Sequence, residues 1–325
     1  MPRKTERIIL VTGATGQIGS ELTIELRKRY GNNNVIAAGH HRKPSSELLN
    51  SGPFIYIDVS NREILEKTVK EYNIDIIYHL AAVLSAVGEE KPALAWHVNM
   101  AGLYNVLEIT RDQNLVSVFW PSSIAVFGPE APRNKTPQNT ILVPQTMYGV
   151  SKVAGELLCN YYFHKFGVDV RSVRYPGIIS STTPPGGGTT DYAVEIFYEA
   201  IKRRQYSCFV REDTVLPMMY MPDCIRAAID LMEAPSSNIK CRTSYNLSGM
   251  SFAAHELASE IKKHIPEFTC KYKPDFRQRI ANSWPMSIDD TFAQEDWNWQ
   301  PNYDLATMTE DMIINLSKRL KEEPN

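Results

Sequence analysis

The sequence lacks the features that mark secreted, membrane-spanning and nucleic-acid-binding proteins. Its 325 residues include only five cysteines, an odd number with no C-x-x-C pair, so we expect reduced thiols rather than a disulfide scaffold. Lysine plus arginine (35) nearly balances aspartate plus glutamate (37) and no basic run occurs, which argues against nucleic acid as a partner. The most apolar stretch, residues 75–87, contains Asp75 and His79 and falls short of the ~20 apolar residues that a membrane span needs. The first seven residues carry no apolar segment, so we expect neither a secretory peptide nor a membrane partner.

Metal-binding patterns are also missing. The seven histidines form no H-E-x-x-H motif and no i,i+4 pair, and no cluster of cysteine and histidine occurs, so no metal site is expected. Cys159 and Cys224 lie on apolar helical faces, where we expect small core residues rather than nucleophiles.

The first half of the chain alternates short apolar runs with helical patterns, which predicts an α/β fold with a Rossmann-type, doubly wound parallel sheet. The predicted strands cover residues 8–12, 35–38, 54–57, 74–80, 116–121 and 168–175. Predicted helices 19–30 and 145–166 end at Gly31 and Gly167, which we expect in the left-handed αL conformation. Ser60-x-x-Glu63 has the pattern of a capping box and predicts the start of a third helix.

The pattern changes after about residue 176. A segment rich in Pro, Gly and Thr, residues 182–190, is followed by helical patterns at 191–204, 222–233, 252–264 and 305–320. We therefore predict a Rossmann dinucleotide-binding domain at residues 1–178 and a smaller, mixed α/β substrate-binding lobe at 179–325, some of whose elements return to the sheet domain.

A glycine-rich motif, Gly13-Ala-Thr-Gly16-Gln-Ile-Gly19, follows the first predicted strand and opens a helix. The first glycine permits a tight turn, the second lets backbone amides approach a pyrophosphate, and the third allows close packing of helix and strand. The start of the helix favours an anion. This context predicts nucleotide binding.

Tyr148-Gly-Val-Ser-Lys152 stands at the start of the long helix 145–166 and places the lysine one turn below the tyrosine. Two other Tyr-x-x-x-Lys pairs, Tyr161/Lys165 and Tyr198/Lys202, show that the spacing alone proves little. Ser123 closes the preceding strand, so a hydroxyl, a phenol and an ammonium group are expected to converge. We expect Lys152 to lower the pKa of Tyr148 toward the range of a general base, and Ser123 to hold the reacting oxygen.

The spacing G-x-x-G-x-x-G, together with the Tyr148/Lys152 pair, resembles the extended branch of the short-chain dehydrogenase/reductase superfamily. This resemblance implies the catalytic residues Ser123, Tyr148 and Lys152 and the cofactor NAD. It also implies a set of cofactor-binding residues: Gly13, Gly16, Gln17, Ile18, Gly19, His40, Arg42, Asp58, Val59, Leu80, Ala81, Ala82, Asn99, Tyr148, Lys152, Tyr175, Pro176 and Ile178.

One segment departs from the family pattern. Members that use NAD commonly carry an aspartate at the end of the second strand, where it accepts hydrogen bonds from the ribose hydroxyls. This chain has Gly39-His40-His41-Arg42-Lys43 there, which is equally compatible with the 2′-phosphate of NADP. The preference for NAD thus follows from the resemblance and not from this segment.

Three segments of the second half, residues 184–194, 217–224 and 283–290, resemble the short-chain type of L-threonine 3-dehydrogenase. This implies oxidation of the threonine C3 hydroxyl to 2-amino-3-oxobutyrate, with substrate contacts from Ser85, Ser123, Tyr148, Thr189, Thr190 and Trp284. The amides of the glycine-threonine loop are expected to cradle the substrate carboxylate. For Trp284, simple packing beside Pro285 is an equally strong interpretation.

The resemblance has further implications and leaves two alternatives open. It implies a 2-amino-3-ketobutyrate CoA ligase as pathway partner and a homodimer that pairs helices near residues 92–112 and 145–166. It also implies a soluble intracellular location, in the mitochondrial matrix of a eukaryote or otherwise in the cytoplasm. The alternatives are an NAD-dependent sugar-nucleotide epimerase or dehydratase and a non-catalytic NAD(P)-binding sensor.

Overall fold

The computed structural model describes residues 7–186 and 188–322, which form two compact units. Unit 1 comprises Met1–Ser123, Thr146–Arg174 and Ile225–Tyr245, and unit 2 comprises Ile124–Gln145, Tyr175–Cys224 and Asn246–Asn325. The units therefore interleave along the chain, and no single cut separates them.

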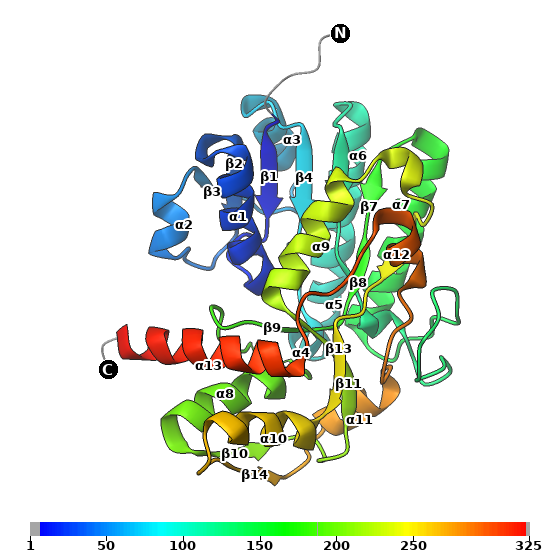
Figure 1. Cartoon of the computed structure of the whole chain (residues 1–325). Coiled ribbons are helices and arrows are strands. Elements are labelled where there is room, and N and C mark those ends of the chain that lie inside the picture. The colour runs from blue at the N-terminus through cyan, green and yellow to red at the C-terminus, as the bar shows by residue number, and fades with distance from the viewer. Residues whose placement is uncertain (1–6, 187, 323–325) are drawn as a thin grey trace. The chain divides into compact units, whose positions relative to one another are not determined.

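Unit 1 is built on a parallel sheet of six strands in the order β3-β2-β1-β4-β5-β7 (Figure 1). These strands are β1 (Ile9–Thr12), β2 (Val35–Gly39), β3 (Phe54–Tyr56), β4 (Ile76–His79), β5 (Ser117–Phe119) and β7 (Val170–Arg171). The strand order reverses between β1 and β4, and open α/β sheets bind ligands beyond the carboxyl ends of strands at such a point. The predicted fold class is confirmed.

The helices of unit 1 are α1 (Gln17–Tyr30), α2 (Ser46–Asn50), α3 (Arg62–Glu71), α4 (Ser85–Glu90), α5 (Pro92–Trp96), α6 (Gly102–Asp112), α7 (Met147–Phe166) and all but the start of α9 (Met221–Glu233). The helices predicted at residues 19–30, 145–166 and 222–233, and the helix predicted to begin after Ser60, are present within a few residues of their predicted bounds, whereas α2 and α4 were not predicted. A π-helical turn, η2 (His97–Ala101), joins α5 to α6, and 3-10 turns occur at η1 (Asn32–Asn34) and η4 (Ser236–Asn238).

Two predicted helix ends are wrong in detail. The N-cap of α3 is Asn61, whose side chain accepts from the amide of Ile64, because the Ser60 hydroxyl instead donates to Asp58. Gly167 adopts the predicted αL conformation after α7. Gly31 does not, with φ 96° and ψ 142°, because the chain enters the turn η1 directly after α1.

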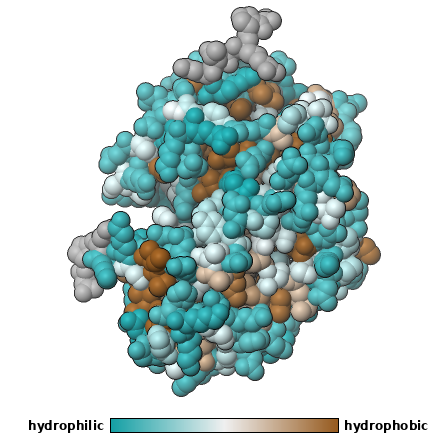
Figure 2. Space-filling view, in the orientation of Figure 1, coloured by the Kyte–Doolittle hydropathy of each residue, from teal (hydrophilic) through white to brown (hydrophobic). Residues whose placement is uncertain are grey.

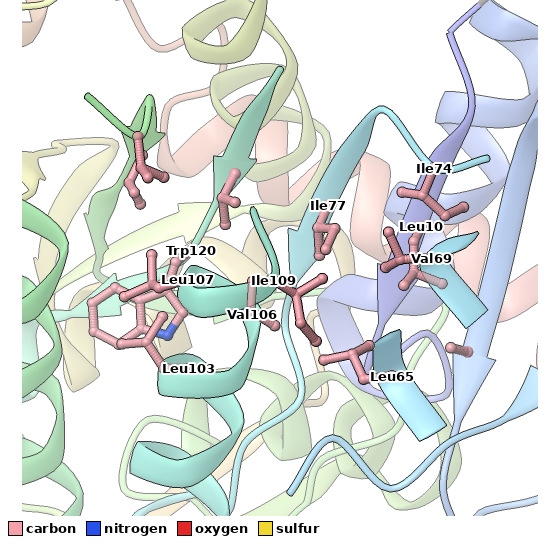
Figure 3. Packing of buried hydrophobic residues seen from close by; sticks show 14 of the residues in the cluster. Leu10, Leu65, Val69, Ile74, Ile77, Leu103, Val106, Leu107, Ile109 and Trp120 are labelled. Carbon is pink, nitrogen blue, oxygen red and sulfur yellow. The ribbon is translucent and has the colours of Figure 1, made fainter. Parts of the chain in front are cut away.

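The core of unit 1 is a continuous cluster of buried apolar side chains between the sheet and its helices (Figure 3). Leu10 and Ile77 come from neighbouring strands, Leu65 from α3 and Leu103 from α6. Cys159 of α7 is fully buried in this cluster, as predicted. This packing fixes α7, the helix that carries the Tyr148/Lys152 pair, on the sheet.

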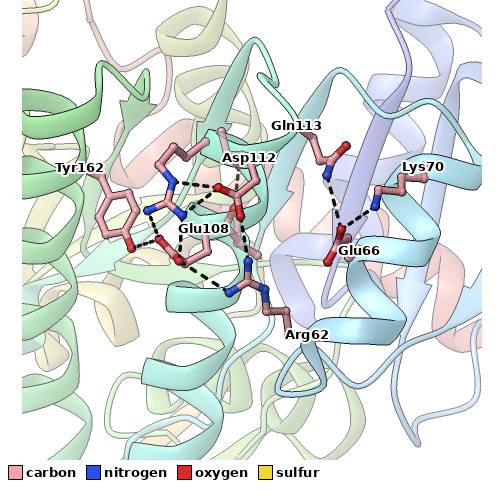
Figure 4. A network of polar contacts seen from close by, with 10 residues as sticks. Arg62, Glu66, Lys70, Glu108, Asp112, Gln113 and Tyr162 are labelled. Atoms are coloured by element: carbon pink, nitrogen blue, oxygen red, sulfur yellow. Dashed lines mark hydrogen bonds and ion pairs between the residues drawn. The ribbon is translucent and has the colours of Figure 1, made fainter.

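A polar network holds α3, α6 and α7 together outside the apolar core (Figure 4). The Tyr162 hydroxyl of α7 donates to Glu108 at 2.6 Å, and Arg62 of α3 pairs with Asp112 at 2.8 Å. Arg111 contacts Glu108 at 2.6 Å, which compensates the charge of this buried carboxylate.

Unit 2 contains two small sheets and five helices that lie wholly within it, among the residues that the structure describes. Its strands are β9 (Gly177–Ile179), β10 (Gln205–Cys208), β11 (Val215–Tyr220), β13 (Met250–Ala253) and β14 (Thr269–Tyr272), arranged as β13-β11-β9 and β10-β14. Its helices are α8 (Tyr192–Arg203), α10 (Ala254–His264), α11 (Arg277–Ser283), α12 (Thr291–Trp297) and α13 (Leu305–Glu322), with a 3-10 turn, η3 (Ile124–Val126). The remaining short strands, β6 (Ser122–Ser123), β8 (Val173–Tyr175) and β12 (Tyr245–Asn246), pair in the order β12-β8-β6.

The surface of unit 2 has a hydrophobic patch over α13 and the adjoining part of α8 (Figure 2). Ile314 of α13 is the large apolar residue of these two helices that is most exposed, at 58%. An exposed patch of this size is ordinary for a protein surface. In the part of the chain that the structure describes, we find no helix with the length and apolarity of a membrane span.

Candidate active site

The glycine-rich turn between β1 and α1 leaves no room for side chains at its first and last glycines. A Cβ on Gly13 would lie 2.6 Å from the Ala81 nitrogen, and one on Gly19 would lie 2.2 Å from the Gly13 carbonyl oxygen. Gly13 also has φ +70°, a conformation that favours glycine. α1 begins after Gly16 without a side-chain cap. The backbone thus forms a cradle at a helix N-terminus, where a dinucleotide pyrophosphate fits.

The end of β4 lies directly against this turn. The Thr12 hydroxyl and Nδ1 of His79 are 2.7 Å apart, and the Leu80 amide donates to the Thr12 carbonyl. Burial lowers the pKa of His79 to about 3, so this imidazole is neutral at physiological pH. Leu80, Ala81 and Ala82 follow at the same edge of the sheet, where they were predicted.

The side chain of Asn99 forms hydrogen bonds with other residues of the chain, which occupy both its oxygen and its nitrogen. Its Oδ1 accepts from the Val83 amide at 2.7 Å, and its Nδ2 donates to the Val83 carbonyl and to Ser151 of α7, both at 3.1 Å. Asn99 lies in the π-helical turn η2. These contacts tie the segment after β4 to the helix that carries Tyr148.

The ends of β2 and β3 bring His40, Arg42 and Asp58 to one side of the turn. Nε2 of His40 lies 3.9 Å from Oδ2 of Asp58, and Nη1 of Arg42 donates to the Thr15 carbonyl at 3.3 Å. Oδ1 of Asp58 accepts from the amide and the hydroxyl of Ser60, and these hydrogen bonds lower the pKa of Asp58. Asp58 also lines a surface pocket with residues 60–63, and Val59 beside it is buried.

Ser123, Tyr148 and Lys152 come together at the end of β6 and the start of α7. Thr146 caps α7 by accepting from the Gly149 amide at 3.0 Å, which places Tyr148 in the first turn. A side-chain hydrogen bond joins Tyr148 to Ser123. Nζ of Lys152 lies 5.4 Å from the centre of the Tyr148 ring and donates to the Pro121 carbonyl at 2.5 Å.

The electrostatics of this trio differ from the expectation. Burial raises the pKa of Tyr148 to about 12, and the hydrogen bond from Ser123 offsets only part of that rise. Burial also lowers the pKa of Lys152 to about 7, against the effect of Cys159 and Glu156, which raise it. The predicted lowering of the Tyr148 pKa by Lys152 is therefore wrong for this structure, because burial disfavours both charged forms.

Glu156, which the sequence analysis did not single out, lies next to the trio. Its side chain is buried, accepts from the Ser122 hydroxyl at 2.6 Å and pairs with Arg174 through contacts of 2.7 and 2.9 Å. It thereby holds the residue that precedes Ser123. The sequence could have indicated Glu156, because it is a charged residue four positions after Lys152 and therefore lies on the same, buried face of α7.

The other two Tyr-x-x-x-Lys pairs lie on helix surfaces. Tyr161 of α7 is exposed, and Nζ of Lys202 merely lies 5.7 Å over the Tyr198 ring. Within the described residues, no group of three or more His, Cys, Asp or Glu side chains is placed to hold a metal ion.

The remaining predicted site residues are divided between the units. Ser85 begins α4 of unit 1 and is half-buried. Unit 2 contains Tyr175, Pro176, Ile178, Thr189, Thr190 and Trp284. The Tyr175 hydroxyl donates to the Cys224 carbonyl at 2.7 Å, and Trp284 is only 6% exposed. The burial of Trp284 favours its packing interpretation.

The loop before α8 differs from the predicted carboxylate cradle. The amides of Gly186 and Gly188 donate to Oδ2 of Asp191 at 2.6 and 2.9 Å. A carboxylate of the chain itself therefore takes these donors at the positive end of α8. For the amides of Gly186 and Gly188, the expectation that they are available to a substrate carboxylate is therefore wrong.

A nucleotide cradle beside a Ser-Tyr-Lys trio agrees with the comparison to known proteins. Residues 9–248 match the NAD dependent epimerase/dehydratase family. The chain belongs to this family. It is 52% identical over 315 residues to an uncharacterized epimerase/dehydratase of Staphylococcus haemolyticus, covering 97% of this chain and 98% of that protein.

This member of the epimerase/dehydratase family is also similar to solved structures over nearly its whole length. The L-threonine dehydrogenase of Clostridium difficile is 50% identical with a TM-score of 0.95, covering 97% of this chain and 99% of that one. A monomeric L-threonine 3-dehydrogenase from a metagenome is 49% identical with a TM-score of 0.92, covering 96% and 99%. The chain is therefore an NAD-dependent enzyme of the extended short-chain dehydrogenase/reductase type.

Proposed function

We propose that the chain oxidises the C3 hydroxyl of L-threonine to 2-amino-3-oxobutyrate, with hydride transfer to NAD. The observation that carries this proposal is the convergence of Ser123, Tyr148 and Lys152 in an NAD-dependent family. The identity of about half of all residues to L-threonine dehydrogenases over nearly the full chain supports the choice of substrate.

In this mechanism Tyr148 takes the proton of the C3 hydroxyl while Ser123 donates a hydrogen bond that orients the substrate oxygen. When bound, NAD supplies the nicotinamide that accepts the C3 hydride. We assign Lys152, whose Nζ lies 5.4 Å from the centre of the Tyr148 ring, to binding the cofactor ribose. Since burial raises the pKa of Tyr148, the phenol must first release its own proton to solvent, and the resulting phenolate then accepts the proton of the C3 hydroxyl.

The dinucleotide is assigned to the turn of Gly13, Gly16 and Gly19, whose backbone bounds the cradle. We also assign to the cofactor Gln17, Ile18, His40, Arg42, Asp58, Val59, Leu80, Ala81, Ala82, Asn99, Tyr175, Pro176 and Ile178, and to the substrate Ser85, Thr189 and Thr190, whereas Trp284, which is buried, is assigned to packing. For Asn99 the hydrogen bonds to Val83 and Ser151 support a role in positioning.

A second candidate function is an NAD-dependent epimerase or dehydratase acting on a sugar nucleotide. The epimerase/dehydratase name of the staphylococcal relative favours it. The two candidates differ in net chemistry, because threonine oxidation accumulates NADH whereas epimerisation returns the hydride to the sugar.

The test measures NADH formation with L-threonine, L-serine, 3-hydroxybutyrate and UDP-glucose. We expect NADH with threonine and little with the others. Turnover of UDP-glucose without net NADH, and none with threonine, would refute the proposal. A matched pair of variants tests the base: Tyr148→Phe should lose activity by ~10²-fold or more, whereas Tyr161→Phe on the same helix should leave it unchanged.

We also propose that the enzyme is a homodimer formed through α5, α6 and α7. Apolar side chains of these helices remain exposed, namely Leu94, Trp96, Tyr104, Val150, Leu157 and Tyr161. Leu157, at 61% exposure, is the most exposed of them. Light scattering should give twice the mass of one chain for the wild-type protein and the mass of one chain for Leu157→Glu. A monomeric wild-type protein would refute the dimer, and the metagenomic relative is described as monomeric.

The product is a β-keto acid, which loses CO2 readily. A 2-amino-3-ketobutyrate CoA ligase that consumes it is therefore the proposed pathway partner. The bacterial origin of the staphylococcal relative favours the cytoplasm over the mitochondrial matrix, and this compartment stays a prediction.

A further inference from the structure

The end of β2 carries basic side chains where NAD-selective Rossmann proteins carry a carboxylate. β2 ends at Gly39 and is followed by His40, His41, Arg42 and Lys43, and no acidic residue occurs before Glu47. In such folds an Asp or Glu about 20 residues after the glycines binds the ribose 2′-hydroxyl, whereas an arginine nearby accommodates a 2′-phosphate.

The backbone brings this segment onto the glycine-rich turn. A Cβ on Gly39 would lie 2.9 Å from Cγ2 of Thr15, so only a residue without a side chain lets β2 end this close. The guanidinium of Arg42 then reaches back to the turn and donates to the Thr15 carbonyl at 3.3 Å. Arg42 is exposed, so most of its donors face solvent at the ribose end of the cradle.

Asp58, a carboxylate near this basic segment, already has hydrogen-bond partners. Oδ1 of Asp58 is taken by the amide and hydroxyl of Ser60, and Nε2 of His40 lies 3.9 Å from Oδ2. The rings of His40 and His41 lie 3.5 Å apart between centroids. The imidazole of His40 thus lies beside Asp58 at the start of the basic segment.

We propose that this enzyme accepts NADP as well as NAD, with Arg42 and His40 binding the 2′-phosphate. An arginine binds phosphate through parallel, charge-assisted hydrogen bonds, and an imidazole can donate one more. Arg42 and His40 are also compatible with the 2′-hydroxyl of NAD, because a hydroxyl oxygen can accept a hydrogen bond from either side chain. The segment directly after β2 carries no carboxylate that would repel a 2′-phosphate, so it admits both dinucleotides. The inference rests on the cofactor role of the glycine-rich turn and not on threonine as the substrate.

The test compares 5′-AMP with 2′,5′-ADP (adenosine 2′,5′-bisphosphate), two fragments that differ by the 2′-phosphate alone. Calorimetry should show that the wild-type protein binds 2′,5′-ADP at least as tightly as 5′-AMP. Arg42→Ala should weaken 2′,5′-ADP by ~10- to 100-fold, the usual value of a charge-assisted hydrogen bond, and change 5′-AMP by less than about threefold. His40→Asp should shift the ratio the same way and restore selection for NAD.

The matched control is Lys67→Ala, which removes a positive charge from the exposed side of α3 in the same unit. It should leave the ratio of the two fragments unchanged. The ratio of kcat/KM for NADP and NAD should follow the binding data in all four proteins.

A wild-type preference for 5′-AMP over 2′,5′-ADP of more than about 100-fold would overturn the proposal. So would an Arg42→Ala variant that weakens both fragments equally. Because these titrations contain no substrate, they separate the two conclusions. If the predicted binding pattern appears but threonine is not oxidised, the proposed function fails and the cofactor inference stands.

Discussion

The buried ammonium group of Lys152 gives the most demanding test of the proposed site, because it predicts that removing a catalytic residue stabilises the protein. Lys152 is 3% exposed, and burial lowers its pKa from 10.5 to about 7. A difference of about 3.5 pKa units corresponds to ~5 kcal/mol of folding free energy spent on the charged form, at 1.36 kcal/mol per unit. The contacts of Nζ with the Pro121 carbonyl and the Trp120 ring recover part of this cost.

The sign of the pH dependence follows from proton counting. Below pH 7 the lysine is charged in both the folded and the unfolded chain, and the full cost applies. Between about pH 7 and 10.5 the unfolded chain binds more protons than the folded one, so the free energy of unfolding rises with pH. Above about 10.5 the lysine is neutral in both states and the cost is gone.

The assay is chemical denaturation of the wild type and Lys152→Met at several pH values, with the difference between the two proteins cancelling all other titrating groups. We expect Lys152→Met to be the more stable protein at pH 7, by ~2–5 kcal/mol, and this advantage to shrink as pH rises to 10. Its threonine oxidation should fall by orders of magnitude. A variant that is less stable than the wild type at pH 7, or a difference independent of pH, would refute the account of Lys152 as a strained, desolvated cation.

Two further predictions concern the surroundings of Lys152. Glu156→Gln removes the ion pair of the buried Arg174 guanidinium, so the free energy of unfolding measured by denaturation should fall by ~3–5 kcal/mol. The substitution also removes a charge that raises the pKa of Lys152, so the alkaline limb of the pH profile of kcat should move to lower pH. A limb that does not move would exclude coupling between Glu156 and Lys152. Gly19→Ala places a Cβ at 2.2 Å from the Gly13 carbonyl oxygen, so the affinity for NAD measured by calorimetry should drop by ~10-fold or more. The control Gly167→Ala adds a Cβ that has no atom within 4 Å beyond its own chain neighbours, so it should leave the affinity for NAD unchanged. Equal affinities in both variants would contradict the proposed cradle.

The sheet and the trio could be predicted because both depend on local signals. Apolar runs set the strands, the glycine spacing marked the first turn, and Tyr148 and Lys152 share one helix face through their i,i+4 spacing. The relation of Ser123 to Tyr148 needed only the end of one strand and the start of the next helix. Helix caps were less certain, because Ser60 and Asn61 both suit the position and the competition was decided by Asp58.

What escaped prediction depends on contacts between distant residues. The partners of Glu156 lie on two other strands, and nothing in the local sequence pairs it with Arg174. The pKa of Tyr148 is raised because the folded chain surrounds the ring, and the hydrogen bond with Ser123 lowers this pKa by less than burial raises it. The same holds for Asp191, whose carboxylate folds back onto the glycine loop that was expected to bind substrate.

These unpredicted contacts explain how the fold sustains a costly active site. α7 is fixed at its start by the Thr146 cap, in its middle by the ion pair of Glu156, and near its end by the hydrogen bond from Tyr162 to Glu108. Between the first two points stand the phenol and the ammonium group, both less stable charged than in water. A helix held at one end only could rotate to relieve that cost by exposing Lys152. Three separate contacts fix α7 along its length, and Lys152 stays buried beside Tyr148.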